Sequence, residues 1–141
     1  MAFLKVGGEP PKKKQRLYLM EIELPSGMHV CKFGKASGLS SKERMLQING
    51  SIFDKFRYTA KIGIKRDREV DADLVFKYEA RLHQFFSDYR YEHNIKWDGI
   101  SECFVIPLDD AVQAYEAVIE GMVPDYKYVL PTAEPEDELP F

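Results

Sequence analysis

Cysteine is scarce in this chain, and long apolar runs are missing. Two cysteines, Cys31 and Cys103, occur among the 141 residues, and neither belongs to a C-x-x-C pair. This usage predicts reduced thiols in the cytosol rather than a disulfide framework or a zinc site. No stretch approaches the roughly 18 apolar residues of a membrane span, and the chain does not open with the charged-then-apolar pattern of a signal peptide. The sequence therefore predicts a cytoplasmic protein that is not exported.

Apolar residues are nevertheless plentiful enough for one folded domain. The chain is 45% hydrophobic, 13% aromatic and 30% charged. This apolar fraction is too high for a disordered chain and is enough to bury a core, and the length is that of a single domain.

Charge is unevenly distributed along the chain, although the formal net charge is only −3. Residues 122–141 hold five acidic side chains against Lys127 alone, which is −4 and leaves the first 121 residues at +1. Basic side chains concentrate near the start of the chain and again between Lys55 and Arg68. The net charge of the chain therefore indicates no particular partner, whereas its two basic segments are compatible with a polyanionic one.

Composition shifts divide the chain into three parts. We interpret residues 1–15, with their glycines, prolines and lysines, as a flexible basic arm. Residues 16–123 carry the periodic apolar patterns of a folded domain. Residues 124–141 are acidic and rich in proline, and we interpret them as a disordered tail.

Periodicity and turn residues predict the elements of the domain. The Pro25-Ser26-Gly27 turn separates two short apolar runs and predicts a hairpin that starts at Arg16. Ser40 and Glu43 have the spacing of a capping box and predict a short helix, which Asn49-Gly50 is expected to end. The later elements are a strand over 56–64, a long helix over 70–89, a strand over 104–106 and a final helix capped by Asp109.

This series of elements predicts an α/β (α+β) domain. Its order is β-β-α-β-α-β-α, with a small central sheet and helices packed on it. The long helix is expected to bury a stripe that includes Val75, Phe76, Leu82 and Phe86.

Glu79 is the first candidate for chemistry. It lies four residues after Val75 and three before Leu82, so helical geometry places it on the buried stripe. His83 lies one turn further on the same face. A buried carboxylate needs a cation, a hydrogen-bond donor or a metal ion, so Glu79 is predicted to form an internal ion pair or to bind a metal.

Five short motifs occur in an order that is more informative than any one of them. They are Tyr18 in a Leu-Tyr-Leu strand, Lys-Phe-Gly-Lys from Lys32, Arg44 on a short helix, Glu-x-x-x-His from Glu79 and Glu-x-Phe from Glu102. Over about residues 16–118 they resemble the GIY-YIG nuclease superfamily, and most of all its small single-domain branch that is common in phages.

The resemblance implies a GIY-YIG-like fold and hydrolysis of phosphodiester bonds in DNA with one divalent ion, Mg²⁺ or Mn²⁺. It makes Glu79 the metal ligand and Arg44 the group that neutralises the phosphate. It makes Tyr18 the group that orients or deprotonates the attacking water. Lys32 stands where the family's second motif usually has tyrosine, so the water-activating group stays open between Tyr18 and Lys32.

The chemistry is consistent with these roles. Attack on a phosphodiester loads negative charge on its non-bridging oxygens, which a metal ion and a guanidinium stabilise. Mg²⁺ accepts one or two protein carboxylates and keeps several waters, so a single glutamate is enough. His83 either orients Glu79, relays a proton or only packs.

Further residues are candidates for substrate binding. Gly34 lets the chain pass close to a substrate, or simply ends a strand. Lys35 and Lys61 are expected to meet phosphates, together with other cations of the body. The other cations considered are Lys42, Arg57, Lys65, Arg66 and Arg68. No module for base recognition is present in the sequence pattern.

The acidic end supports a different hypothesis. The segment that begins at Glu134 and ends at Phe141 resembles the C-terminal tip of bacterial single-stranded DNA-binding proteins. Such a tip docks on replication and repair proteins through its phenylalanine and carboxylate. The segment is alternatively a solubilising tail, or it occupies the protein's own basic groove. The competing function is therefore a catalytically inactive module of the same fold that binds nucleic acid or a replication or repair protein.

Overall fold

A β-hairpin forms the centre of the molecule. The computed structural model describes residues 14–36, 40–121 and 127–129. Strand β1 (Lys14–Glu23) pairs antiparallel with β2 (His29–Ala36), so that Arg16 faces Ala36 and Glu23 faces His29. Gly27 takes a φ of 91° in the predicted turn, a value that glycine adopts without steric cost. The first strand begins at Lys14, two residues before the predicted start.

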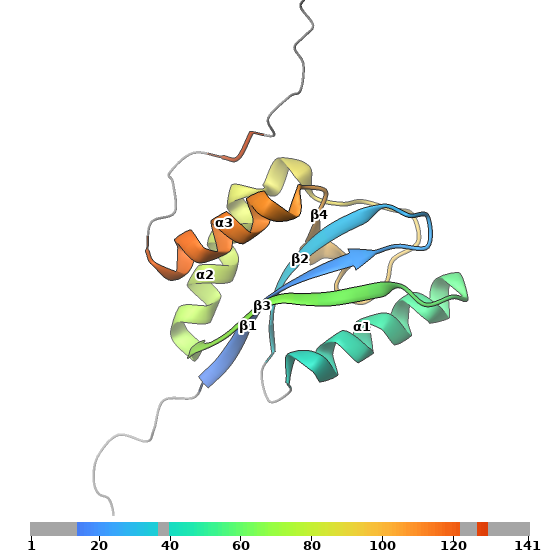
Figure 1. Cartoon of the computed structure of the whole chain (residues 1–141), viewed down its shortest axis with the longest axis horizontal. Coiled ribbons are helices and arrows are strands. Elements are labelled where there is room, and N and C mark those ends of the chain that lie inside the picture. The colour runs from blue at the N-terminus through green and yellow to red at the C-terminus, as the bar shows by residue number, and fades with distance from the viewer. Residues whose placement is uncertain (1–13, 37–39, 122–126, 130–141) are drawn as a thin grey trace, which may run out of the picture.

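The hairpin is extended into a four-stranded antiparallel sheet with the order β3-β1-β2-β4. Helix α1 covers one face of this sheet, and α2 and α3 cover the other (Figure 1). The predicted mixed α/β class is confirmed. The elements follow the chain as β1, β2, α1, β3, α2, β4 and α3, with two short 3₁₀ turns before β4.

Helix α1 (Ser41–Phe56) is about twice as long as the sequence pattern predicted. The capping box between Ser40 and Glu43 is present, as predicted. Asn49 does not end the helix, because its side-chain amide bonds both backbone groups of Ala60 at 3.1 Å and ties the helix to the following loop. Ile52 is fully buried, and burial of such a side chain is worth about 1.5–3 kcal/mol. Tertiary packing therefore overrides the local turn signal.

Strand β3 (Lys61–Asp71) lies later than predicted. The alternating residues from 56 onwards suggested a strand there, but α1 continues to Phe56 and Arg57 caps it with a φ of 66°. β3 runs antiparallel to β1 from Lys14↔Asp71 to Glu23↔Lys61, with an irregularity between Leu19 and Met20.

Helix α2 and strand β4 are shorter than predicted. Helix α2 (Ala72–Phe85) ends in a 3₁₀ turn, η1 (Ser87–Tyr89), and a second turn, η2 (Ile100–Glu102), leads into β4 (Cys103–Phe104). Helix α3 (Leu108–Ile119) is preceded by Pro107 at its N-cap, not by Asp109. Phe76 is 57% exposed, so its place on the predicted buried stripe of α2 was wrong.

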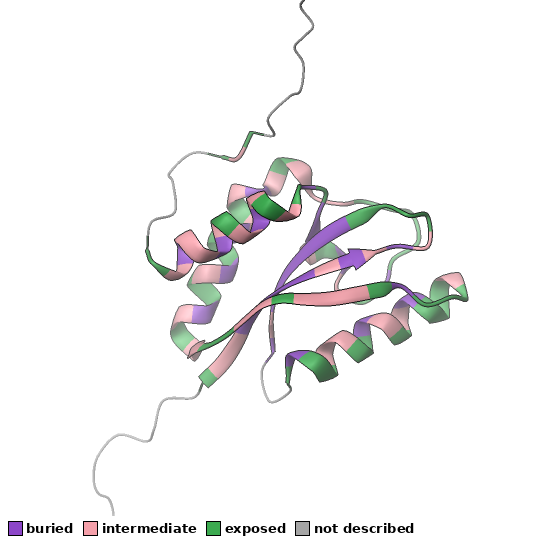
Figure 2. Ribbon diagram, in the orientation of Figure 1, coloured by how far each residue is buried: buried purple, intermediate pink, exposed green. Residues whose placement is uncertain are grey.

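Alternation along β1 divides the core into two clusters, one on each face of the sheet. Leu17 and Leu19 pack with α2 and α3, whereas Tyr18 and Met20 pack with α1. Figure 2 shows the buried residues concentrated on β1, β2 and the inner faces of the helices. The hydroxyl of Tyr115 donates to the carbonyl of Leu17 at 2.6 Å and joins α3 to the sheet.

Tyr128 lies inside the segment that the sequence predicted to be a disordered tail, yet it packs on the domain. Its backbone N–H donates to the carbonyl of Phe85 at 2.8 Å, and its ring contacts the rings of Phe85, Phe86 and Tyr89. Residues 124–126 and 130–141 of the predicted tail, and residues 1–13 of the predicted arm, lie outside the described residues. No helix in the described ranges is long and apolar enough to cross a bilayer.

Candidate active site

Lys32 and Tyr18 form the centre of the candidate site. They lie on facing strands of the hairpin with their side chains on the same face of the sheet, and the Lys32 Nζ is 3.0 Å from the Tyr18 hydroxyl oxygen. Both side chains are fully buried. Burying a lysine ammonium group costs free energy unless its N–H groups are hydrogen-bonded. The contact with Tyr18 therefore has to be part of a larger polar network.

Two glycines make room for this pair. Gly34 lies directly opposite Tyr18, and a Cβ at Gly34 would fall 2.4 Å from the Tyr18 hydroxyl oxygen. Gly99 has a φ of 90°, and a Cβ there would fall 2.6 Å from Cε of Lys32. Any side chain at either position would displace the pair, so Gly34 has a local structural role in the site.

Glu102 is the anionic partner of Lys32. It ends the η2 turn just before β4 and forms an ion pair with the ammonium group. Burial alone lowers the pKa of Lys32, but the charges of Tyr18 and Glu102, with hydrogen bonds to both, outweigh it and leave the pKa raised. Lys32 is therefore held in its protonated form.

Glu79 is buried on α2, as predicted, with 8% of its surface exposed. Its Oε1 lies 3.7 Å from Nζ of Lys35, whereas its Oε2 is buried without a hydrogen-bond partner in the described residues. Burial, and after it the charge of Glu102, raises the pKa of Glu79, while Lys35 and Lys32 oppose the shift. The predicted ion pair exists, but it involves only one of the two carboxylate oxygens.

Lys35 stands at the rim of the site. Its side chain is 30% exposed, and its ammonium also lies 4.8 Å from the ring centroid of the exposed Phe76. A cation over an aromatic face is attracted by the ring quadrupole, so Phe76 helps hold Lys35 between Glu79 and solvent.

Arg44 is brought to the site by the position of α1. The hydroxyl of Ser41 donates to the carboxylate of Asp67 on β3 at 2.9 Å and fixes the first turn of α1 to the sheet. Arg44 forms a two-bond pair with Asp98, at 2.6 Å from Nη1 to Oδ2 and 3.2 Å from Nη2 to Oδ1. The hydrogen bond to Asp98 is the main cause that raises the pKa of Arg44, and the nearby Tyr18 raises it further.

His83 contacts the sheet rather than the cluster of charges. Its Nε2 lies 2.9 Å from the carbonyl oxygen of Phe33 and its ring is 5.4 Å from that of Phe104. Burial lowers the pKa of His83, although the bond to Phe33 opposes the shift. The neutral ring therefore donates Nε2–H to the carbonyl, which fixes the distance between α2 and β2.

The sequence-predicted residues thus fall into two groups. Tyr18, Lys32, Arg44 and Glu79 are linked through direct or one-residue contacts, and the predicted substrate residues Gly34 and Lys35 adjoin them. Lys61 is not part of this cluster. It faces Glu23 in the sheet, five residues along β1 from Tyr18, which is roughly 17 Å at the rise of a strand.

The basic run on β3 is largely neutralised by ion pairs. Arg66 and Arg68 both bind the carboxylate of Glu116 on α3, at 2.7 and 3.1 Å. Lys65 lies 3.8 Å from Glu21. These cations take part in contacts within the domain, and their predicted role in binding phosphates stays a prediction.

Two residues of the site were missed as contributors to its chemistry. Glu102 was noticed only as part of a Glu-x-Phe motif, which gave no role. Asp98 carried no signal at all, because its partner Arg44 is 54 residues away. Their contacts depend on the fold of the segment between Tyr91 and β4.

Comparison of the chain with family models, curated proteins and solved structures gives no match.

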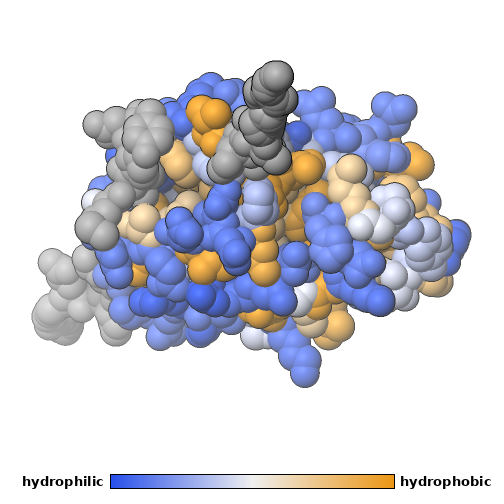
Figure 3. Space-filling model, turned by 45° about the horizontal axis from the view of Figure 1, so that its top comes forward, coloured by the Kyte–Doolittle hydropathy of each residue, from blue (hydrophilic) through white to orange (hydrophobic). Residues whose placement is uncertain are grey.

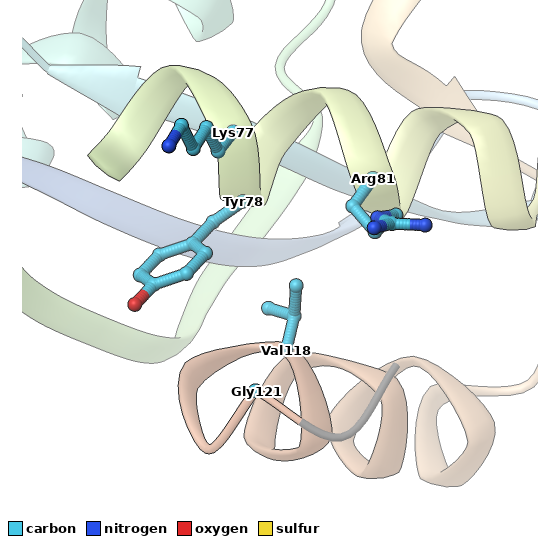
Figure 4. Close-up of a pocket in the computed structure, with 5 residues that line it drawn as sticks. All are labelled: Lys77, Tyr78, Arg81, Val118 and Gly121. Atoms are coloured by element: carbon cyan, nitrogen blue, oxygen red, sulfur yellow. The ribbon is translucent and has the colours of Figure 1, made fainter. Parts of the chain in front are cut away.

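Two hollows in the described part of the surface are not lined by the clustered residues. One of about 200 Å³ lies between α2 and α3, lined by Lys77, Tyr78 and Arg81 on one side and Val118 and Gly121 on the other (Figure 4). Another, at the tip of the hairpin, has a volume of about 380 Å³ and includes Tyr58 and Tyr91. Hydrophilic side chains predominate on the face in Figure 3, with apolar surface in patches between them.

The site has the donors and acceptors for phosphodiester chemistry. No group of three or more His, Cys, Asp or Glu side chains in the described ranges is arranged to hold a metal ion, which leaves the carboxylates of Glu79 and Glu102 as candidates. One or two carboxylates suit Mg²⁺, which keeps several waters. Both cysteines are buried and free, and burial raises the pKa of each thiol to about 12, so neither is a nucleophile.

Proposed function

We propose that this chain is a metal-dependent endonuclease that hydrolyses phosphodiester bonds in DNA, built on a GIY-YIG-like fold. The observation that carries the proposal is one connected set of side chains from five separate elements. Arg44 lies next to Tyr18, Tyr18 bonds Lys32, Lys32 pairs with Glu102, and Glu102 adjoins Glu79. Four of these residues are predicted catalytic residues, His83 being the one outside the set, and Glu102 comes from a motif to which the sequence assigned no role.

The protonated state of Lys32 supports a division of roles between the two residues that the sequence left open. Because its neighbours keep Lys32 charged, it is a poor proton acceptor and a good electrostatic partner. The Lys32 ammonium donates to the Tyr18 hydroxyl oxygen at 3.0 Å and would stabilise negative charge that forms on that oxygen. Tyr18 is then the group that orients the attacking water and helps to deprotonate it, while Lys32 stabilises the charge.

The environment of Glu79 supports the proposal that a metal ion binds there. A buried carboxylate oxygen without a hydrogen bond is expensive, and the unpartnered Oε2 of Glu79 fits a hard cation better than it fits a purely structural pair. Glu79 would hold the ion, with Glu102 close enough to join it. A bound Mg²⁺ or Mn²⁺ would supply a Lewis acid that neutralises charge on the phosphate and the leaving oxygen.

Arg44 and Lys35 are the cations for the phosphate itself. The guanidinium fork matches two phosphate oxygens, and Lys35 at the rim provides a point charge. Water then attacks phosphorus, the bond to the leaving oxygen breaks, and the negative charge of the transition state is shared by these groups. His83 acts as a positioning residue that sets the place of α2, and with it Glu79, against the hairpin.

Nicking of supercoiled plasmid tests the proposal. The wild-type chain is expected to cut in Mg²⁺ or Mn²⁺ and to stop in EDTA. Glu79→Gln and Arg44→Ala should each lower the rate by at least about 10²-fold, and Tyr18→Phe by about 10²–10⁴-fold. Lys55→Ala is the charge-matched control for Arg44→Ala, because it removes an exposed cation from the same helix, α1. This variant should cut DNA at the wild-type rate.

The same experiment distinguishes the nuclease from the competing function, a catalytically inactive binding module. A wild-type chain that binds DNA but never cuts with any divalent ion would leave a binding module of this fold. Deletion of residues 134–141 tests the acidic segment separately, because loss of binding to a replication or repair protein supports docking, whereas a gain in nuclease rate supports self-inhibition.

A further inference from the structure

Asp98 occupies the guanidinium fork of Arg44. The two bonds of 2.6 and 3.2 Å use both terminal nitrogens. Asp98 is itself held in place, since its backbone N–H donates to Oγ of Ser51 at 2.8 Å. The Arg44 side chain is 20% exposed and the Asp98 side chain 50% exposed, so this pair forms at the solvent side of the candidate site.

A carboxylate and a phosphodiester offer the same feature to arginine, two anionic oxygens that accept parallel N–H bonds. One fork cannot bind both in this way at the same time. We infer that Asp98 is an internal competitor of the substrate phosphate: it fills the fork of Arg44 in the free protein and is displaced when a phosphodiester binds. This inference rests on the proposed function and adds a residue that sets substrate affinity.

The surroundings of Asp98 allow it to leave without unfolding the loop. Trp97 and Ile100 on either side are 4% and 9% exposed and anchor the segment in the core. The backbone is closed by bonds from Ile100 N–H to the Trp97 carbonyl and from Glu102 N–H to the Gly99 carbonyl. Release of Arg44 therefore requires only rotation of the exposed Asp98 side chain.

Competition has a cost and a benefit for the protein. It weakens binding of every phosphate, because the ion pair must be broken first. It also keeps Arg44 from binding free anions that reach the site without the further contacts of a polynucleotide. Removal of the competing charge should therefore strengthen DNA binding through Arg44 and through no other residue.

Binding of a short fluorescent duplex tests the inference, with cleavage prevented by the Glu79→Gln background. Asp98→Asn keeps the size of the side chain but loses its charge, and it should tighten the Kd by about tenfold, the effect of one charge-assisted hydrogen bond. Asp54→Asn on α1 is the control, because it makes the same change in net charge at an exposed carboxylate. In an Arg44→Ala background the effect of Asp98→Asn should disappear.

The results separate this inference from the proposed function. Equal Kd values for Asp98→Asn and Asp54→Asn, or weaker binding by Asp98→Asn, would overturn the competitor role and indicate that Asp98 orients Arg44 for the phosphate. If the wild-type chain still cuts DNA in that case, the proposed function stands. If no variant binds and the wild type never cuts, the function fails and the inference fails with it.

Discussion

The ammonium nitrogen of Lys32 lies 3.0 Å from the hydroxyl oxygen of Tyr18, on the facing strand of the central hairpin. The two residues are 14 positions apart in sequence, and both are completely buried. The contact exists because Gly34, opposite Tyr18, has no side chain. The geometry of the proposed water-activating group therefore depends on a glycine that itself does no chemistry.

Substitution of this glycine should disable the site without unfolding the domain. A Cβ at Gly34 would lie within 3 Å of both Tyr18 and Lys32, so Gly34→Ala should lower the cleavage rate by about 10²-fold or more, as expected for a lost general base. Single-turnover cleavage and circular dichroism measure the two effects.

Gly50 provides the matched control for this change. It lies within α1, and nothing is within 4 Å of a Cβ built on it. Gly50→Ala should leave cleavage unchanged and stabilise the protein by about 0.5–1 kcal/mol in urea unfolding. If Gly34→Ala behaved in the same way as Gly50→Ala, the Lys32–Tyr18 contact would have no part in catalysis.

Glu79→Gln should lose activity but not stability. Burial and Glu102 raise the pKa of Glu79, which means that the ionised carboxylate is disfavoured where it lies. A neutral amide of the same shape removes that cost. Thermal unfolding in EDTA at pH 7 should give a Tm for Glu79→Gln at or above that of the wild type. A marked fall in Tm would show that the pair with Lys35 is structural and would weaken the case for a metal at this residue.

His83 should make stability depend on pH near neutrality. Burial lowers its pKa below the usual 6.5, so the native state holds the ring neutral while the unfolded chain takes up a proton first. The contribution of His83 is complete above pH 6.5 and is lost as the pH falls through the lowered native pKa. Urea unfolding from pH 7.5 to 5 should show the wild type losing stability relative to His83→Gln, whose amide can still donate to the Phe33 carbonyl. Parallel curves for the two proteins would contradict this.

Tyr128 should contribute to the stability of the domain. Its ring contacts three aromatic rings, and such contacts are worth about 0.5–1.5 kcal/mol beyond the area they bury. A chain that ends after residue 126 should unfold at a lower urea concentration than one that ends after residue 129. Equal midpoints for the two truncated chains would mean that the Tyr128 contacts add nothing.

The parts of the fold that could be predicted are those that local pattern decides. The hairpin follows from its turn and the two apolar runs beside it. The start of α1 follows from the Ser40–Glu43 box, and burial of Glu79 follows from its spacing to Val75 and Leu82. Each of these features involves residues that are close in the chain, so periodicity and turn chemistry are sufficient.

The predictions that were wrong or missing concern features that depend on contacts between residues far apart in the chain. Asn49 reads as a helix stop in isolation, but in the fold it bonds Ala60 and the helix continues. Phe76 matches the helical stripe, yet it is turned to solvent beside Lys35. The role of Asp98 depends on Arg44, which is far away in sequence, and no local pattern indicates such a pair.

Anomalous diffraction from crystals soaked with Mn²⁺ and a short DNA duplex would locate both the proposed metal ion and the substrate phosphate. We predict one manganese peak at the carboxylate of Glu79, absent in Glu79→Gln, with a backbone phosphate bound between that ion and Arg44. A manganese ion bound elsewhere while Glu79 keeps only Lys35, or a duplex lying on a surface away from Tyr18 and Arg44, would contradict it.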